Sequence, residues 1–232
     1  MSKIFKISLV VALVITVVVM LFSRTQNEVV ISNIEPQEKT ETKEVNIIAF
    51  GDSLTAGYGL QINESYPAQL EKKLKERGLA VKVINSGVSG ESTKGNLERA
   101  KFISEQNPDI VLLGIGGNDA LRQLSIEETK KNIEDTILTL KDTAKPPVIV
   151  LLQMQAPINA GLKYKQDFDA IYTDLTRKHE LVLLPFITLE VFSNPDYKLP
   201  DGIHYNQAGY EKIIELYLLE PIIGIIKKIN RD

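Results

Sequence analysis

The sequence contains no cysteine, no tryptophan and only two histidines among its 232 residues. Because cysteine is absent, neither disulfides nor thiolate metal sites can form, and the fold must be stabilised by a packed core. The net charge of −3 and the scattered lysines argue against a protein that binds nucleic acid, which would gather positive charge on one surface. About 190 residues follow the N-terminal segment, which is enough for one compact domain.

Residues 1–23 carry a long hydrophobic run. Lys3 and Lys6 are followed by an almost uninterrupted apolar stretch over residues 7–22. This pattern predicts an export signal or an uncleaved membrane anchor, with a buried core helix as the weaker alternative. Residues 19–23 fit a cleavage site poorly and a lipoprotein signal would need cysteine, so the uncleaved anchor is favoured, with the two lysines in the cytoplasm.

The residues after this run have a different composition. Residues 24–43 are rich in Glu, Gln, Thr, Ser and Lys, which predicts a flexible tether. We therefore expect a monomeric folded domain over residues 44–232, held outside the cytoplasmic membrane by the N-terminal segment. If that segment is cleaved, the domain is released on the same side.

In the folded part, short apolar runs alternate with longer segments of helical period. The predicted strands are Val45–Phe50, Val81–Asn85, Ile110–Gly114, Val148–Leu152 and Leu181–Leu184. The predicted helices are Pro67–Arg77, Lys94–Glu105, Ile126–Lys141, Tyr164–Lys178 and Gln207–Ile229, with N-caps at Ser125 and Asn206. Short apolar strands separated by helices pair in parallel with both sheet faces covered, so the predicted fold is an α/β three-layer sandwich. In such sheets ligands bind beyond the carboxyl ends of the strands.

One serine stands in a glycine-flanked turn directly after the first predicted strand, in the run Gly51-Asp52-Ser53-Leu54. A serine hydroxyl becomes a strong nucleophile only when a base removes its proton, and histidine suits that task near neutral pH. Near the other end of the chain, Asp201 precedes His204 by three residues, close enough for the carboxylate to reach the imidazole. Taken alone, Asp201 and His204 fit ordinary turn residues equally well; together with Ser53 they favour a serine hydrolase.

The remaining histidine and the glycine motifs narrow this hypothesis. His179 stands at a charged helix end, which predicts a solvated surface residue. Ser53 does not lie in a Gly-x-Ser-x-Gly elbow, because Thr55 occupies the second glycine position, so the α/β-hydrolase fold is disfavoured. The run Gly114-Ile115-Gly116-Gly117 does not complete a dinucleotide-binding fingerprint, because Asp119 stands where the third glycine belongs.

Acyl transfer also needs hydrogen-bond donors aimed at the oxyanion that forms on the substrate. Three candidates lie after predicted strands: the backbone N–H of Ser53, the backbone N–H of Gly90 and the side-chain amide of Asn118. Gly90 alone fits a purely conformational turn glycine better, since such turns are common after parallel strands. The sequence therefore predicts an oxyanion site only in combination with the serine and histidine motifs.

The chain resembles the GDSL or SGNH hydrolase family in four sequence blocks that occur in the family's order. These blocks are Gly51-Asp52-Ser53-Leu54, Gly90, Gly116-Gly117-Asn118-Asp119 and Asp201-Gly202-Ile203-His204. The resemblance implies a flavodoxin-like sandwich, Ser53 as nucleophile, Asp201 and His204 as the rest of a triad, and Gly90 and Asn118 as oxyanion donors with the Ser53 amide. In one departure, Tyr205 stands where the family usually has proline after the histidine.

Within the family, the closer resemblance is to bacterial thioesterases, lysophospholipases and arylesterases. It implies hydrolysis of small acyl esters or thioesters through an acyl-enzyme, with no metal and no organic cofactor. Two alternatives stay open: a carbohydrate O-deacetylase with the same triad, and an inactive tethered binding module. Residues after the fourth predicted strand favour acyl chains over sugars, because they form an apolar wall: Met154, Ala156, Pro157, Ile158 and Leu162.

Overall fold

The computed structural model describes residue 20 and residues 43–231. The chain divides into one unit of residues 1–42 and another of residues 43–232. Apart from Met20 and Lys43, the predicted anchor and tether lie outside the described residues. Within the part that is described, no helix combines the length and the apolar character that crossing a membrane requires.

A parallel sheet forms the centre of residues 43–231. Its strands are β1 (Val45–Gly51), β2 (Val81–Gly87), β3 (Ile110–Gly114), β4 (Val148–Gln153) and β5 (Val182–Pro185). They lie in the order β2-β1-β3-β4-β5, and all neighbours are parallel. The side chains of β3 are buried on both faces, as parallel pairing between two helical layers requires.

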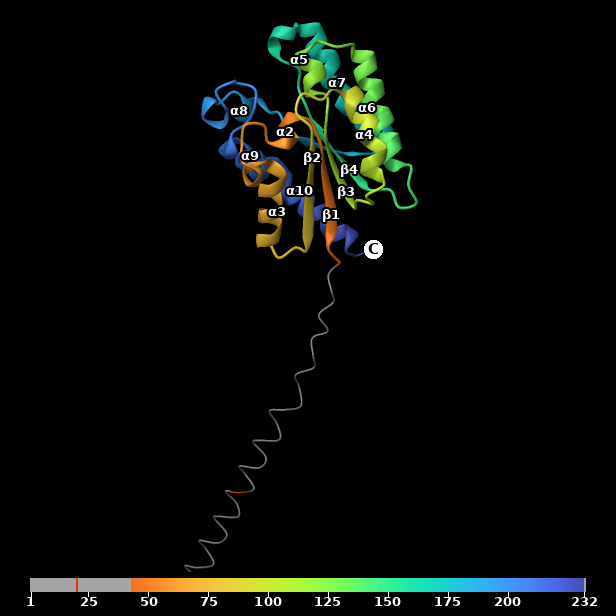
Figure 1. The fold of residues 1–232 in the computed structure, drawn as a ribbon, viewed down its shortest axis with the longest axis vertical. Coiled ribbons are helices and arrows are strands. Elements are labelled where there is room, and N and C mark those ends of the chain that lie inside the picture. Colours follow the sequence, from red (N-terminus) through yellow and green to blue (C-terminus); the bar gives the residue numbers. More distant parts are fainter. Residues whose placement is uncertain (1–19, 21–42, 232) are drawn as a thin grey trace, which may run out of the picture. The chain divides into compact units, whose positions relative to one another are not determined.

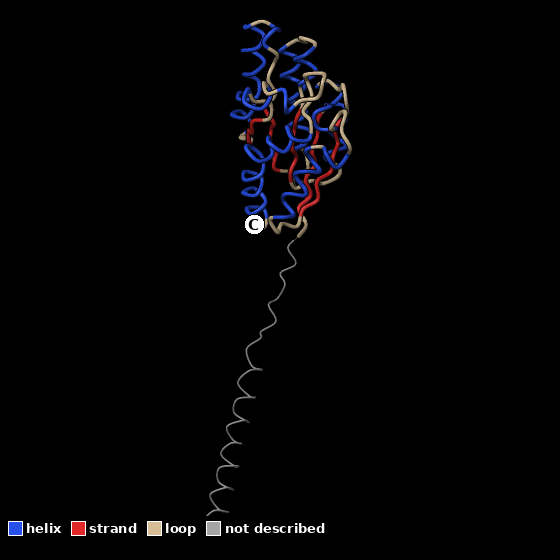
Figure 2. Tube along the Cα trace, turned by 90° about the vertical axis from the view of Figure 1, so that its left-hand side faces the viewer, coloured by secondary structure: helices blue, strands red, loops and turns tan. Residues whose placement is uncertain are grey.

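Helices cover both faces of the sheet, as Figure 1 shows. One layer contains α3 (Tyr66–Glu76), α9 (Gln207–Ile213) and α10 (Leu219–Ile229), and the other contains α4 (Thr93–Ser104), α6 (Ile126–Lys141) and α7 (Leu162–His179). The predicted three-layer α/β/α sandwich is confirmed. After a quarter turn, Figure 2 again shows the last described helix, α10, ending at the end of the sheet where β1 begins. The opposite end carries the carboxyl ends of the strands.

The last predicted helix, Gln207–Ile229, is wrong in one respect. A π-helical turn over Ile214–Leu218 separates α9 from α10, and Leu219 N–H bonds to the Ile214 carbonyl five residues earlier. Pro221 follows directly, lacks an N–H and would clash with the carbonyl of Tyr217 in a regular α-helix. The wider turn next to this proline accommodates it.

Short helices at the carboxyl ends of the strands were not predicted. They are α2 (Ser53–Ala56) after β1, α5 (Gly117–Leu121) after β3 and α8 (Leu189–Phe192) after β5, together with 3₁₀ turns at Ile62–Glu64, Ile158–Ala160 and Pro195–Tyr197. Each is too short for a periodic hydrophobic pattern to be visible. In Figure 1, α2 and α5 lie at the upper end of the sheet, where the candidate site residues gather.

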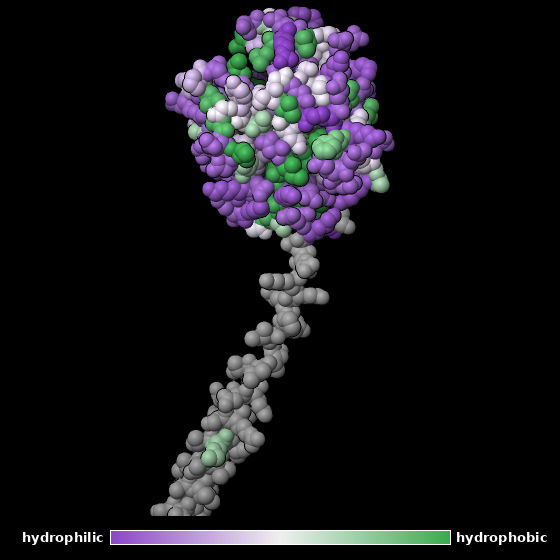
Figure 3. Space-filling model, in the orientation of Figure 1, coloured by the Kyte–Doolittle hydropathy of each residue, from purple (hydrophilic) through white to green (hydrophobic). Residues whose placement is uncertain are grey.

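The face of the domain seen in Figure 3 is mostly hydrophilic, with hydrophobic residues in small separate groups. The apolar side chains instead fill the space between the sheet and its two helical layers. Beneath the candidate site this core is aromatic: Tyr66 packs edge-on against Phe186, and Tyr205 packs edge-on against Tyr210. Edge-to-face aromatic pairs of this kind stabilise a core beyond their buried area.

Candidate active site

Ser53 lies on a sharp turn between β1 and α2. Gly51 ends β1 at a point where a Cβ atom would lie 2.4 Å from the Gly114 carbonyl oxygen of the neighbouring strand, so no side chain fits. Asp52 then caps α2, because its Oδ1 accepts a hydrogen bond from Leu54 N–H at 3.0 Å. The glycine and the cap together reverse the chain, so that Ser53 becomes the first residue of α2.

The loop before α9 brings Asp201 and His204 to this serine. Asp201 Oδ1 accepts hydrogen bonds from the backbone N–H groups of Ile203 and His204, at 2.9 and 3.0 Å, which closes a tight turn. Its second oxygen, Oδ2, lies 2.7 Å from His204 Nδ1. His204 Nε2 lies 2.8 Å from Ser53 Oγ. The three side chains expected to act together therefore form one hydrogen-bonded series.

Tyr205, at the position where proline is usual, anchors this loop in the core. Its side chain is fully buried, and its hydroxyl donates a hydrogen bond to the Phe186 carbonyl at 3.2 Å. The ring makes edge-on contacts with Phe186, Phe192 and Tyr210. A buried aromatic residue thus holds the backbone next to His204 by packing, in place of the rigid ring of a proline.

Two carboxylates near the Ser53–His204 pair have opposite electrostatic environments. Burial raises the pKa of Asp52 from its ordinary value of 3.8 to about 6, although the Leu54 N–H bond and the nearby His204 act against this shift. Burial also opposes ionisation of Asp201, but the hydrogen bonds from His204 and Ile203 outweigh it and lower the pKa to about 2. Asp201 therefore stays ionised beside the imidazole.

Asn118 and Ser53 both line a cavity that opens beside the serine. It is the second residue of α5, whose N-cap Gly116 has a left-handed φ of 104° and no room for a side chain, since a Cβ would lie 2.6 Å from the Tyr172 hydroxyl. That hydroxyl donates to the Ile115 carbonyl at 2.9 Å, which fixes the turn before α5. The Asn118 amide nitrogen makes a long contact of 3.5 Å to Asp52 Oδ2.

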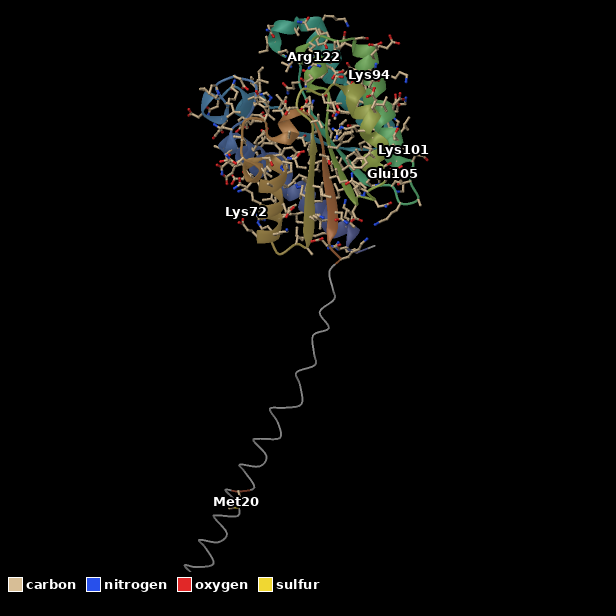
Figure 4. All side chains as sticks on the ribbon, viewed as in Figure 1. Met20, Lys72, Lys94, Lys101, Glu105 and Arg122 are labelled. Carbon is tan, nitrogen blue, oxygen red and sulfur yellow. The ribbon has the colours of Figure 1, made fainter. Side chains whose placement is uncertain are left out.

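Gly90 lies in an exposed turn after β2 and does not line that cavity. Its φ of 80° is left-handed, a conformation that glycine adopts without strain. Its carbonyl accepts a hydrogen bond from Arg122 Nη2 at 2.9 Å. In Figure 4, Arg122 lies at the end of the domain that carries α5. Of the predicted oxyanion donors, Ser53 and Asn118 line the cavity, whereas Gly90 does not.

A second link joins the loops that carry Gly90 and Asn118. Asp119 is buried, and its two oxygens accept hydrogen bonds from the backbone N–H and the hydroxyl of Thr93, at 2.9 and 2.6 Å. Thr93 opens α4, so Asp119 of α5 caps the neighbouring helix. Together with the Arg122 contact, this bond fixes the loop after β2 relative to the loop after β3.

A cavity of about 520 Å³ opens beside Ser53. Most of its lining is apolar, and it comes from the loops after β1, β3, β4 and β5 and from the loop before α9: Asp52, Ser53, Leu54, Gly117, Asn118, Leu121, Gln155, Ala156, Pro157, Ile158, Asn159, Lys165, Ile187, Thr188, Leu189, Phe192 and Ile203. Its volume is typical of pockets that bury small organic ligands. The cavity can therefore hold an apolar chain that ends at the serine hydroxyl.

The apolar wall predicted after β4 is partly wrong. Ala156, Pro157 and Ile158 line the cavity, but Met154 and Leu162 do not. Met154 is fully buried, and its Cε would lie 3.2 Å from a Cβ atom on Gly114 at the end of β3. Leu162 begins α7 and is exposed to solvent.

The loop after β4 is held by α7. Asp169 accepts a hydrogen bond from Ala156 N–H at 3.0 Å, and Lys165 donates to both Asp169 and the Ala156 carbonyl. Residues after β5 complete the wall opposite, including Leu189 and Phe192. Sequence reasoning missed this half of the cavity, although the rule that ligands bind beyond parallel strands applies equally to β5.

Sequence reasoning also failed to identify Asp52 as a helix cap, although an aspartate directly before a short helix is a recognisable N-cap.

His179 was expected to be solvated, and that prediction is wrong: its side chain is only 13% exposed, and Nε2 lies 2.6 Å from Glu134 Oε1. It ends α7, just before β5 begins, and is not among the residues that line the cavity. Among the residues that the structure describes, no group of three or more His, Cys, Asp or Glu side chains is placed to hold a metal ion.

Comparisons with known proteins identify the family to which the chain belongs. Residues 49–212 match the model of the GDSL-like Lipase/Acylhydrolase family. An arylesterase of Vibrio mimicus is 34% identical and aligns with 76% of this chain and 88% of its own. Thioesterase 1/protease 1/lysophospholipase L1 of Escherichia coli strain K12 is 33% identical, with 77% and 85% aligned. The crystal structure of AlinE4, an SGNH-hydrolase family esterase, is 40% identical, with a TM-score of 0.64 over 75% of this chain and 92% of the other.

Proposed function

The chain belongs to the GDSL-like lipase/acylhydrolase family and is a hydrolase of ester bonds, and from this premise we propose that it cleaves acyl esters and thioesters through an acyl-enzyme on Ser53. One observation carries the proposal: the unbroken series from Asp201 Oδ2 to His204 Nδ1 at 2.7 Å and from His204 Nε2 to Ser53 Oγ at 2.8 Å. A nucleophile, a base and a group that orients the base are within hydrogen-bond reach of one another.

In the first half of the reaction, His204 carries a ring proton on Nδ1 and through it donates a hydrogen bond to Asp201, which stays ionised. Nε2 accepts the proton of the Ser53 hydroxyl while Oγ attacks the carbonyl carbon of the substrate. The imidazolium that forms is stabilised by the ionised Asp201. The bond to the alcohol or thiol then breaks, and His204 gives its proton to this leaving group.

In the second half, water replaces the alcohol or thiol. His204 removes a proton from the water as its oxygen attacks the acyl carbon, and the bond to Ser53 Oγ breaks with return of the proton to the serine. A carboxylic acid leaves. The Ser53 N–H, the Asn118 amide and the Gly90 N–H would donate to the oxyanion in both halves, and the position of Asn118 on the cavity wall supports its part most directly.

The shape and lining of the cavity favour short-to-medium acyl chains. Ala156, Pro157, Ile158, Leu189 and Phe192 offer apolar surface to a chain bound to Ser53. Each methylene that they bury would contribute about 0.8 kcal/mol. Such a gain accumulates with chain length, whereas an acetyl group on a sugar would use little of this surface. We therefore place acyl esters and thioesters ahead of acetylated glycans as substrates.

A substrate panel tests this function. It compares p-nitrophenyl esters of two to sixteen carbons, acyl-CoAs, a lysophospholipid, and acetylated xylan or peptidoglycan. We expect kcat/KM to rise as the acyl chain is lengthened beyond acetyl, and a fluorophosphonate probe to label Ser53. Preference for an acetylated glycan with no gain from a longer chain would overturn the substrate class and favour a deacetylase. Absence of turnover on every substrate would favour a binding module.

Two leucines provide a matched test of the cavity. Leu189 and Leu162 are each 73% exposed, but only Leu189 lines the cavity. We expect Leu189→Ala to reduce the gain in kcat/KM per added methylene and Leu162→Ala to leave it unchanged. Equal profiles for the two variants would mean that the acyl chain does not bind along the wall after β5.

We also propose that residues 1–23 hold the domain outside the cytoplasmic membrane, with residues 24–43 as a tether. The proposal rests on the sequence pattern, and the relatives named above are bacterial. Removal of residues 1–42 is expected to give a soluble domain with full activity, while the whole chain fractionates with membranes. A shortened soluble form that begins soon after Ser23 would identify a cleaved signal instead.

A further inference from the structure

Tyr58 covers the imidazole of His204. The ring centroids lie 4.6 Å apart and the ring planes are inclined by 36°. Tyr58 is nevertheless 52% exposed, so its ring is not held there by burial in the core. Isolated exposed aromatic residues need no special explanation, but this one lies against the proposed general base.

The backbone around Tyr58 fixes the direction of its side chain. Gly57 and Gly59, on either side, both have left-handed φ angles, of 77° and 78°. A Cβ on Gly57 would lie 2.6 Å from Ser65 Cβ, and a Cβ on Gly59 would lie 2.7 Å from Leu199 Cδ1. Only glycine combines this conformation with such close approach, so the turn has little freedom to change shape.

The same turn is linked to Ser53 by a hydrogen bond and to His204 through Leu199. Tyr58 N–H donates to the Ser53 carbonyl at 3.1 Å, and Leu199 N–H donates to the His204 carbonyl at 2.8 Å. Gly59 therefore packs the Tyr58 turn against the side chain of Leu199, whose backbone is bonded to His204. The aromatic ring is carried by the nucleophile's own turn and lies on the histidine of the opposite loop.

We infer that Tyr58 is a positioning residue for His204, and this inference rests on the proposed function. The imidazole is held at its two nitrogens by Asp201 and Ser53, and those bonds leave its faces free. The Tyr58 ring covers one face, limits tilting of the imidazole and excludes water from it. When His204 takes the serine proton, the electron-rich ring face also attracts the positive charge that develops.

The inference differs from a role in substrate binding. Tyr58 does not line the cavity that would hold the acyl chain. Two carboxylates, those of Asp201 and the buried Asp52, interact with His204. Loss of Tyr58 should therefore slow the reaction for all acyl chains by the same factor, without a change in their relative preference.

The test compares Tyr58→Ala, Tyr58→Leu and Tyr58→Phe in the full chain, with Phe102→Ala as control, since Phe102 is a 65% exposed aromatic residue on α4. We expect Tyr58→Ala to lower kcat and the rate of fluorophosphonate labelling of Ser53 by roughly three- to tenfold, with KM and thermal stability little changed. Tyr58→Leu should recover part of the loss. Tyr58→Phe, which keeps the ring, and Phe102→Ala should match the native protein.

Four outcomes are separable. A uniform loss of kcat across acyl chains from two to ten carbons, rescued by phenylalanine, supports the inference. A loss confined to KM, or to esters with aromatic leaving groups, would assign Tyr58 to substrate binding and overturn it. Native rates in Tyr58→Ala would overturn it as well. Full turnover by Ser53→Ala, measured in parallel, would instead refute the proposed function, because no variant of Tyr58 can restore or remove the nucleophile.

Discussion

The two segments that meet at Ser53 and His204 are held in different ways. The turn after β1 is part of the core: Asp52 is 1% exposed, and Gly51 packs directly against the neighbouring strand. The Asp201–His204 loop lies at the surface, and its shape comes from hydrogen bonds to Asp201 and from one buried anchor, Tyr205. The proposed reaction would therefore pair one residue that is fixed by burial with another that is fixed by local hydrogen bonds.

The two aspartates show what this difference does to charge. Burial raises the pKa of Asp52 to about 6, whereas hydrogen bonds overcome burial and lower the pKa of Asp201 to about 2. A carboxylate that must stabilise an imidazolium is useful only when ionised, which the surface loop ensures. The buried carboxylate of Asp52 instead caps α2, and it has no part in the proposed reaction that its raised pKa would impair.

The largest effect should come from the residues at the junction of the two segments. Ser53→Ala and His204→Ala are each expected to lower kcat by about 10⁴- to 10⁶-fold, and the double variant to lose little more, because the two act as a unit. Single-turnover and steady-state assays measure this. Additive losses in the double variant would show that the serine and the histidine act independently.

The next largest loss of activity is expected for Asn118→Ala. Its amide would contact charge that exists chiefly in the tetrahedral intermediate, so we expect a loss of about 10²- to 10³-fold in kcat, or 2.7–4 kcal/mol, with folding intact. The measurement is kcat and KM on one ester. A raised KM at unchanged kcat would mean that Asn118 binds substrate and belongs with the cavity wall.

The pH dependence of stability separates the two aspartates. The folded-state pKa of Asp52 is raised from 3.8 to about 6, so the stability that its protonated form contributes is complete below pH 3.8 and lost as pH rises through 6. This loss amounts to something on the order of 3 kcal/mol. Urea unfolding of the native protein and of Asp52→Asn between pH 4 and 7 should show the native protein losing stability relative to the variant.

Asp201 should behave in the opposite sense. Its folded-state pKa is lowered from 3.8 to about 2, so its contribution to stability is present above pH 3.8 and is lost as pH falls through 2. Asp201→Asn should therefore differ from the native protein by a constant amount between pH 4 and 7. If the difference in unfolding stability from the native protein changed with pH in the same direction for both variants, the comparison between the buried turn and the surface loop would be contradicted.

The smallest effect should come from the exposed link between the oxyanion loops. Arg122→Ala removes the hydrogen bond to the Gly90 carbonyl and should lower kcat by roughly three- to tenfold, the equivalent of about one such bond. Lys94, exposed on the first turn of α4 near the same loop, supplies the control variant Lys94→Ala. Identical losses in the two variants would point to a general effect of surface charge.

The sequence predicted the sheet and the long helices because their periodic patterns extend over whole elements. The strand predicted at Ile110–Gly114 and the helix predicted at Ile126–Lys141 have the observed bounds. Short helices such as α2, α5 and α8 have fewer than two turns, so no periodic hydrophobic pattern could predict them. The π-helical turn before Pro221 was not predictable, because an amphipathic pattern does not distinguish hydrogen bonds between residues i and i+5 from the i to i+4 bonds of an α-helix.

The candidate site was predictable to the extent that it follows from motifs. Ser53, Asn118, Asp201 and His204 carry recognisable blocks, and the fold brings them to one end of the sheet. The cavity wall was not predictable to the same degree, because no motif indicates that Met154 is buried and that Leu189 lines the cavity. The raised pKa of Asp52 likewise depends on packing that no motif specifies.

The distance along the chain between Ser53 and His204 also has a consequence for biosynthesis. The two residues are separated by 151 positions, and a ribosome that adds about 5–20 residues per second needs roughly 8–30 s to make that stretch. During this interval the emerging chain contains Ser53 but not His204. If the two residues act together as proposed, the polypeptide gains its activity on ester bonds only after β5 and the residues before α9 have been synthesised and have folded against the rest of the sheet. A product that ends before residue 204 would then be inactive.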